Sequence, residues 1–98
     1  MKIVWSPLSL EKITDISEYI AHDNLTAAEK WIDAIFSVVG RLSKFPESGR
    51  IVPEFTKKDL REIIFGNYRI IYCIKDDQIQ ILTIRHGKQI ISEQDIIE

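Results

Sequence analysis

Six polar side chains in the second half of the chain are of types that act on anionic substrates. They are Glu54, Arg61, Arg69, Arg85, His86 and Lys88. Cleavage of RNA through its 2′-hydroxyl needs a base for that hydroxyl, an acid for the departing oxygen and cations that offset charge on the phosphorus oxygens. Glu or His can supply the first two, and the planar donor fork of Arg can supply the third. If these side chains converge in the fold, they could carry out metal-free phosphodiester chemistry.

The same side chains also have a purely structural explanation. Arg and Glu on a half-exposed sheet are most often solvated or paired across strands, and a strand-end His such as His86 is more often structural than catalytic. The sequence has no Gly-rich phosphate loop, no Cys-x-x-Cys or His-Glu-x-x-His pattern and no nucleophile elbow. The two imidazoles, His22 and His86, lie far apart, and Cys73 is the single cysteine. We therefore expect no metal site and no internal disulfide.

The length and composition are those of one soluble globular domain, residues 1–98. The chain is 45% hydrophobic and 29% charged, which is ordinary for such a domain. A chain this short can bury one core but not an enclosed cofactor cavity as well, so we expect a surface site and no cofactor. Nothing resembles a signal peptide, and no apolar run approaches the roughly 20 residues that span a bilayer. We expect a cytoplasmic protein that does not bind membranes.

Charge is distributed unevenly along the chain. The formal net charge is −2 and the sequence pI is about 5.7. Residues 1–40 carry −3, residues 41–88 carry +4 and residues 89–98 carry −3. Bulk charge therefore does not indicate a nucleic-acid-binding protein, which usually has a strong basic excess. The middle segment could still form a local basic patch.

The first half of the sequence predicts a short strand and two helices. Residues 2–5 are β-prone, and Ser6 followed by Pro7 is typical of a helix start. Apolar residues then recur at helical spacing for about 15 residues, to near residues 22–24. For the second helix, Thr26 and Glu29 match a capping box, and Asn24 is a competing cap. The short link between the helices predicts an antiparallel helical hairpin.

After Gly49 the apolar period changes from helical to the two-residue period of strands. The sequence predicts a brief strand at 51–52 and longer ones at 60–65, 68–75 and 78–86, with turns at 66–67 and 76–77. The last of these strands is apolar on both faces, so we expect it to be central or covered. Residues 89–98 are amphipathic and could form a short C-terminal helix or a tail.

The predicted fold class is α+β. It consists of an N-terminal strand, an antiparallel helical hairpin and then a C-terminal antiparallel sheet of three to four strands. With the hairpin on one face of the sheet, we expect the other face to be half exposed. The basic side chains and His86 should gather on that exposed face.

Several stretches, taken together at this chain length, resemble a known family. They are Ala28 and Trp31 with Leu42, Phe45-Pro46 and Gly49-Arg50, followed by 60–63 (LREI), 68–72 (YRIIY) and 81–87 (ILTIRHG). This ordered set resembles the RelE/ParE superfamily of bacterial toxins over nearly the whole chain. The resemblance implies the toxin half of a type II toxin–antitoxin module, neutralised by a cognate antitoxin in a complex that could be oligomeric.

The resemblance implies one of two mechanisms. RelE-like members cut mRNA in the ribosomal A site, whereas ParE-like members inhibit DNA gyrase. Glu54, Arg69 and His86 fall where some ribosome-dependent members carry a base, a phosphate clamp and an acid/base. The nucleases, however, usually have an aromatic residue where Gly87 stands, are strongly basic, and use a Lys pair that only Lys57-Lys58 resembles.

The ending His86-Gly87-Lys88 and the low pI favour a ParE-like toxin that binds gyrase. In that case the target-binding residues are Arg61, Arg69, Arg85, His86 and Lys88, together with the C-terminal segment. The alternative is a ribosome-dependent mRNA endoribonuclease that uses Glu54, Arg69 and His86. A third possibility is a partner protein without toxicity. In every case we expect an antitoxin segment, helix or added strand, to dock on the fold.

Overall fold

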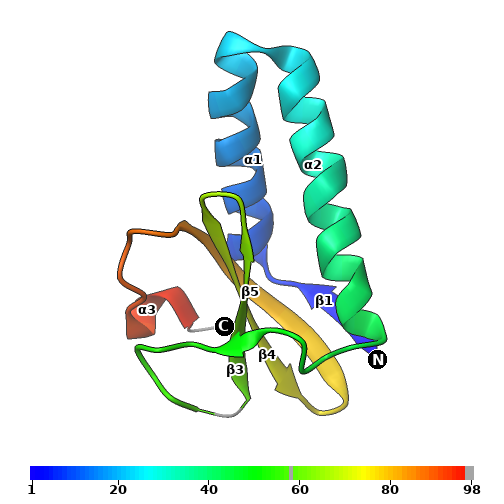
Figure 1. Ribbon diagram of the computed structural model, residues 1–98, viewed down its shortest axis with the longest axis vertical. Coiled ribbons are helices and arrows are strands. Elements are labelled where there is room, and N and C mark those ends of the chain that lie inside the picture. Colours follow the sequence, from blue (N-terminus) through cyan, green and yellow to red (C-terminus); the bar gives the residue numbers. More distant parts are fainter. Residues whose placement is uncertain (58, 97–98) are drawn as a thin grey trace.

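The computed structural model describes residues 1–57 and 59–96, and its element order is that of the predicted α+β fold (Figure 1). Strand β1 (Lys2–Trp5) leads into helices α1 (Pro7–Asp23) and α2 (Leu25–Gly40). The 3-10 turn η1 (Arg41–Ser43) follows, and then the strands β2 (Arg50–Ile51), β3 (Leu60–Phe65), β4 (Tyr68–Lys75) and β5 (Gln78–His86), with a short helix α3 (Glu93–Ile96) at the end. Lys58 and residues 97–98, on which part of our sequence predictions fell, lie outside the described residues.

The two long helices form the expected antiparallel hairpin, joined by the single residue Asn24. The side chain of Ser6 caps α1 by accepting a hydrogen bond from Ser9 N at 3.0 Å. Asn24 caps α2, because its Oδ1 accepts from Ala27 N at 3.0 Å. The predicted capping box at Thr26 is therefore wrong: Thr26 lies inside the helix, and the competing cap is the one used. Within the described residues, neither this hairpin nor α3 provides a helix that is long and apolar enough to cross a membrane.

The sheet has five strands in the order β1-β5-β4-β3-β2. The sequence predicted the antiparallel β3-β4-β5 meander and the inner position of β5. It did not predict that β1 pairs in parallel with β5, with Lys2 opposite Gln78 and Trp5 opposite Ile81. Strand β2 covers only a two-residue stretch of β3. The first strand of the chain thus completes the sheet beside the last one.

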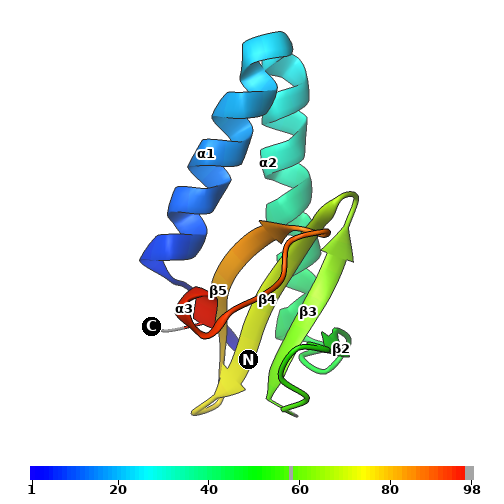
Figure 2. The ribbon, with the colours of Figure 1, turned by 90° about the vertical axis from the view of Figure 1, so that its left-hand side faces the viewer.

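The main core lies between the hairpin and one face of the sheet (Figures 1 and 2). Helix side chains at heptad-like spacing meet alternate residues of β4 and β5 there. The fully buried members are Ile13, Ile35, Val39, Leu42, Ile70, Tyr72, Ile79, Ile81 and Ile84. The hairpin extends well beyond the sheet in Figure 1, so its far half has no sheet beneath it.

The other face of the sheet is covered, and our expectation that it would be half exposed is wrong. A second cluster packs there, made of Val52, Leu60, Ile71, Leu82 and Ile91. The segment after β5 runs back across the sheet to α3, as Figure 2 shows. Apolar residues on both sides of the strands therefore have partners, which agrees with the two-sided hydrophobicity of β5.

A one-residue irregularity between β4 and β5 decides which side chains share a face. Next to the Asp76-Asp77 turn the register pairs Tyr72 with Ile81. Beyond it, Ile71 pairs with Thr83, so Leu82 is an extra residue in β5. Because side chains alternate between faces, such a bulge moves every later residue of the strand to the opposite side. In an unbroken register His86 would lie on the face of Arg69; with the bulge it lies opposite Tyr68, on the side of the hairpin.

Candidate functional site

The guanidinium of Arg69 lies at the centre of an ion-pair network on the face away from the hairpin. The Arg69 side chain is only 7% exposed. Its Nη1 and Nη2 each donate to one carboxylate oxygen of Glu54 at 2.8 Å, and its Nε donates to Oε1 of Glu62 at 2.6 Å. Nη1 also donates to the backbone oxygen of Gln89 at 3.1 Å. These four hydrogen bonds occupy most of the five N–H donors of the group.

Hairpin geometry explains why Glu62 reaches Arg69. Glu62 is opposite Ile71 across β3 and β4, and Arg69 is the diagonal neighbour two residues along the same face. The Glu62 side chain is fully buried and also accepts a hydrogen bond from Nε of Arg50. A buried carboxylate requires such partners, because an uncompensated buried charge destabilises the fold strongly.

Glu54 closes the network from the loop after β2, and its electrostatics follow from its contacts. The hydrogen-bonded guanidinium of Arg69, assisted by the backbone N–H of Ile91, lowers the pKa of Glu54 to about 2. In turn, the carboxylate of Glu54, with that of Glu62, raises the pKa of Arg69. Both groups therefore stay charged across the physiological range. A carboxylate with so low a pKa is a poor general base at neutral pH.

The C-terminal segment is attached to the same network. Ile91 N donates to Oε2 of Glu54 at 2.9 Å, and Ile91 is buried in the second cluster. Arg85 on β5 lies directly opposite Arg69 on β4. Its Nη1 is 3.2 Å from Oδ1 of Asp95 in α3. Two arginines face each other on adjacent strands, and each is neutralised by a carboxylate from a covering segment.

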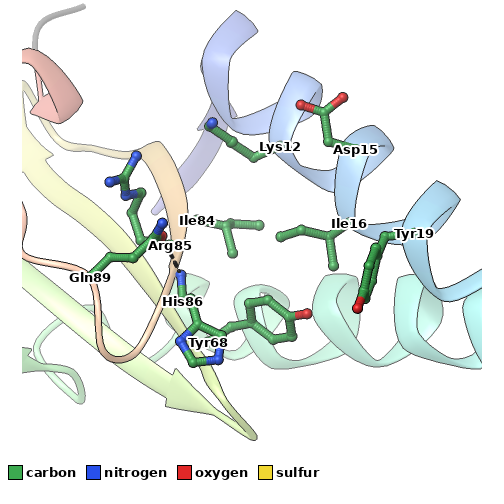
Figure 3. A pocket seen from close by; sticks show the side chains of 9 residues that line it. All are labelled: Lys12, Asp15, Ile16, Tyr19, Tyr68, Ile84, Arg85, His86 and Gln89. Atoms are coloured by element: carbon green, nitrogen blue, oxygen red, sulfur yellow. Dashed lines mark hydrogen bonds between the residues drawn. The ribbon is translucent and has the colours of Figure 1, made fainter.

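His86 lies on the hairpin side, at the end of β5, where it lines a cleft of about 470 Å³ (Figure 3). Ile16 of α1 and Ile84 of β5 point toward each other across its floor. The imidazole meets the ring of Tyr68 edge-on, with 6.0 Å between the ring centroids. The cleft is lined by Lys12, Asp15, Ile16, Tyr19, Tyr68, Ile84, Arg85, His86 and Gln89.

Hydrogen bonds within the turn after β5 fix the orientation of His86. Its Nδ1 accepts from Lys88 N at 3.3 Å, so the neutral ring carries its proton on Nε2. The backbone N–H of His86 donates to Oε1 of Gln89 at 3.1 Å, and Gln89 N donates back to the His86 oxygen at 2.9 Å. The turn therefore holds an exposed imidazole at the rim of the cleft.

Of the two remaining basic residues of the predicted site, Arg61 lies away from the cleft and Lys88 lies in the turn next to His86. Arg61 donates through Nη1 to the backbone oxygens of Gly49 at 2.9 Å and Glu47 at 3.3 Å. Lys88 is exposed in the turn after β5. Over residues 1–57 and 59–96, no three His, Cys, Asp or Glu side chains gather in a way that could hold a metal ion.

Three comparisons with known proteins agree on the kinship of this chain. Residues 3–91 match the family model described as the ParE toxin of the type II toxin–antitoxin system parDE. The chain belongs to the ParE toxin family. Relatives include toxin Y4kP of Sinorhizobium fredii, 32% identical over 90 residues and covering 90% of both chains, and toxin RelE2 of Caulobacter vibrioides, 27% identical over 89 residues and covering 91% of this chain and 98% of that one.

A solved structure has the same fold as this ParE-family toxin. It is that of the chromosomal ParDE toxin–antitoxin system from P. aeruginosa, which matches with a TM-score of 0.75 at 20% sequence identity. The match covers 90% of this chain and 97% of the other. The predicted membership of the RelE/ParE superfamily is thus confirmed, and with it the role of toxin in a type II toxin–antitoxin system, which implies a cognate antitoxin as partner.

The structure does not bring the predicted site residues of this ParE-family toxin together on one face. Glu54 and Arg69 meet, but as an ion pair in which the Arg69 side chain is buried, the Glu54 side chain is partly exposed, and the C-terminal segment adds a hydrogen bond through Ile91. His86 lies on the opposite side of the sheet, beside Tyr68. Our expectation of one shared open face is therefore wrong for Arg69 and His86, and the bulge at Leu82 is the physical reason.

The sequence analysis did not identify several residues of the ion-pair network around Arg69 and of the cleft beside His86. Glu62 was predictable, because the turn at Gly66-Asn67 pairs Phe65 with Tyr68 and so puts Glu62 diagonal to Arg69. The α1 side of the cleft was not predictable, because Tyr19 falls at the same helical spacing as the apolar residues of α1 that were expected to be buried. Tyr19 is in fact 77% exposed.

Proposed function

We propose that this ParE-family toxin arrests growth by binding and inhibiting DNA gyrase, and that it does not cut RNA. The observation that carries the proposal is the state of Arg69 and Glu54. A phosphate clamp needs free guanidinium donors, and a general base needs a pKa near the working pH. Arg69 has its donors committed to Glu54, Glu62 and Gln89, and Glu54 is held ionised with a pKa of about 2.

Inhibition by binding makes no such demands, because it needs an exposed surface and not a reactive pair. Of the predicted target-binding residues, Arg85, His86 and Lys88 are close together at the end of β5, and they remain our candidates. Arg69 and Arg61, with their internal hydrogen bonds, would act by holding the fold in shape.

Incubation of the purified toxin with gyrase, ATP and relaxed plasmid tests the proposal. We expect supercoiling to fall with rising toxin concentration and to recover when the cognate antitoxin is added first. Full supercoiling at saturating toxin would contradict the proposal, provided that the same preparation arrests growth when it is expressed without antitoxin. Absence of growth arrest would favour a partner protein without toxicity.

The alternative is a ribosome-dependent mRNA endoribonuclease using Glu54, Arg69 and His86. One observation favours it: the imidazole of His86 is exposed and has a defined tautomer beside Tyr68, as an acid/base requires. Primer extension on a translated mRNA would then reveal new 5′ ends. His86→Gln, a change at an exposed position, should abolish them; their persistence in this variant would exclude that role for His86.

A further inference from the structure

We infer that the cleft between α1 and the ends of β4 and β5 is the surface with which this toxin engages its target, and that it receives an acidic polypeptide segment carrying a large apolar side chain. The inference rests on the proposed function, in which the toxin acts by binding. It names the binding surface and the chemistry of the partner.

The shape and floor of the cleft suit a protruding side chain. Its volume of about 470 Å³ lies within the range of pockets that hold organic groups. Ile16 and Ile84 form the floor, and Tyr68 lines the cleft beside them (Figure 3). The ring of Tyr68 also contacts that of Trp31 edge-on, with 5.6 Å between the ring centroids. This apolar base offers nothing to a phosphate backbone, but it can bury an aromatic or aliphatic anchor.

An exposed aromatic residue stands beside the cleft. Tyr19 is 77% exposed on α1 and lines the cleft together with Tyr68 and His86. Exposed tyrosines next to a preformed pocket are typical of the few residues that dominate an interface, because they add large contact area at low entropy cost.

The charge around the cleft selects the partner. Among the described residues that line it, Lys12 is a cation and Asp15 is an anion, whereas Arg85 is already paired with Asp95 at 3.2 Å. Lys88 adds a further positive charge in the adjoining turn. This local excess contrasts with the net charge of −2 for the whole chain. Complementary charge speeds association and excludes basic partners, so an acidic segment fits this rim.

Two pairs of variants test the inference in the supercoiling assay. Tyr19→Ala removes the exposed aromatic, and Leu25→Ala is its control, because Leu25 is 65% exposed at the start of α2 and is not part of the cleft. Lys12→Glu reverses a charge at the rim, and Lys30→Glu reverses an exposed charge on α2. We expect Tyr19→Ala and Lys12→Glu each to raise the half-inhibiting concentration by roughly tenfold or more, and the two controls to change it by less than about twofold.

The salt dependence of inhibition tests the acidic character of the partner. Attraction between opposite charges at a rim is screened by ions, so the half-inhibiting concentration of the unmodified toxin should rise with ionic strength. In Lys12→Glu this rise should be smaller. Tyr19→Ala, Leu25→Ala and Lys30→Glu replace exposed side chains and should unfold at the same urea concentration as the parent chain. Lys12 is half-buried, so the same measurement on Lys12→Glu shows whether that variant keeps its fold.

The outcomes separate this inference from the proposed function. If the parent toxin leaves gyrase active, the proposed function fails, and growth arrest on induction then becomes the readout for the same four variants. If Tyr19→Ala and Lys12→Glu inhibit gyrase and arrest growth as well as the controls do, the inference is overturned. It is equally overturned if they lose only antitoxin binding, or if the parent toxin binds naked DNA and Lys12→Glu abolishes this binding.

Discussion

The carboxylate of Glu54 accepts three hydrogen bonds, two from Arg69 and one from the backbone of Ile91. These contacts hold its pKa near 2 in the folded chain, against 4.5 for an unperturbed Glu. A carboxylate whose pKa is lower in the folded state stabilises the fold above the unfolded pKa. That contribution is lost as the pH falls from about 4.5 toward 2.

Glu54→Gln should therefore destabilise the protein by roughly 1 to 2 kcal/mol at neutral pH, less than about 1.4 kcal/mol for each pKa unit would give, because solvent screens this partly exposed carboxylate. The difference from the parent chain should shrink as the pH is lowered toward 3. Urea unfolding at a series of pH values measures it. Glu11→Gln, which removes an exposed carboxylate of α1, should show no such trend. A difference that stays constant with pH would mean that Glu54 is not held ionised by Arg69.

Gly49 is required for a different reason: the surrounding atoms leave no room for a side chain at this position. A Cβ at Gly49 would lie 2.5 Å from the Tyr72 hydroxyl oxygen and 2.6 Å from the backbone oxygen of Glu62. The Tyr72 hydroxyl accepts from Gly49 N at 2.9 Å and donates to Pro46 O at 2.7 Å, so it cannot move without losing both bonds.

Gly49→Ala should accordingly lower the free energy of unfolding by about 1 to 3 kcal/mol. Gly40→Ala is the matched control, because a Cβ at the end of α2 meets nothing within 4 Å and the backbone there is helical. That change should be neutral or should stabilise by up to about 1 kcal/mol. Equal effects of the two substitutions in urea unfolding would contradict the packing described around Tyr72.

At the scale of elements, the sequence predicted the order and type of nearly every helix and strand, because periodicity and turn residues are local signals. The turns at Gly66 and at Asp76-Asp77 adopt positive φ, as hairpin turns require. The bulge at Leu82 has no such local signal. It separates His86 from Arg69, because it shifts the later residues of β5 to the other face. This is why the elements were predictable and the grouping of the site residues was not.

The start of α2 allows a direct test between the two caps that the sequence offered, Asn24 and the capping box at Thr26. Asn24→Ala removes the side chain that accepts from Ala27 N, and it should cost about 1 kcal/mol. Thr26→Ala, at the position that a capping box would use, should change stability by less than about 0.5 kcal/mol. Thermal or urea unfolding of both variants gives the comparison, and a larger loss for Thr26→Ala would restore the capping box.

At the scale of the whole molecule, the chain builds two apolar layers on one sheet, and the second layer is what covers Arg69 and Glu62. This covering was not predictable from the sequence, because the pattern of residues 89–98 is equally compatible with a tail and with a short helix. The exposed fractions of two neighbouring residues show which side of this segment packs on the sheet: Ile91 is 2% exposed and Ile90 is 78% exposed.

Ile91→Ala should destabilise the fold by about 2 to 4 kcal/mol, because it leaves a cavity among Val52, Ile71 and Leu82. Ile90→Ala should have an effect below about 0.5 kcal/mol, which makes it the matched control. Urea unfolding followed by circular dichroism measures both. Similar stabilities of the two variants would mean that the C-terminal segment does not pack on the sheet in solution.

The parallel pairing of β1 with β5 joins residues 2–5 to residues 78–81, which a ribosome makes much later. While the polypeptide is still growing, Lys2–Trp5 have no partner, because the residues opposite them, Gln78 to Ile81, have not yet been synthesised. The cleft likewise needs α1 together with residues 68–89. A chain that ends before Gln78 lacks both the partner of β1 and one wall of the cleft, so if the cleft binds the target, such shortened products should leave the cell unharmed.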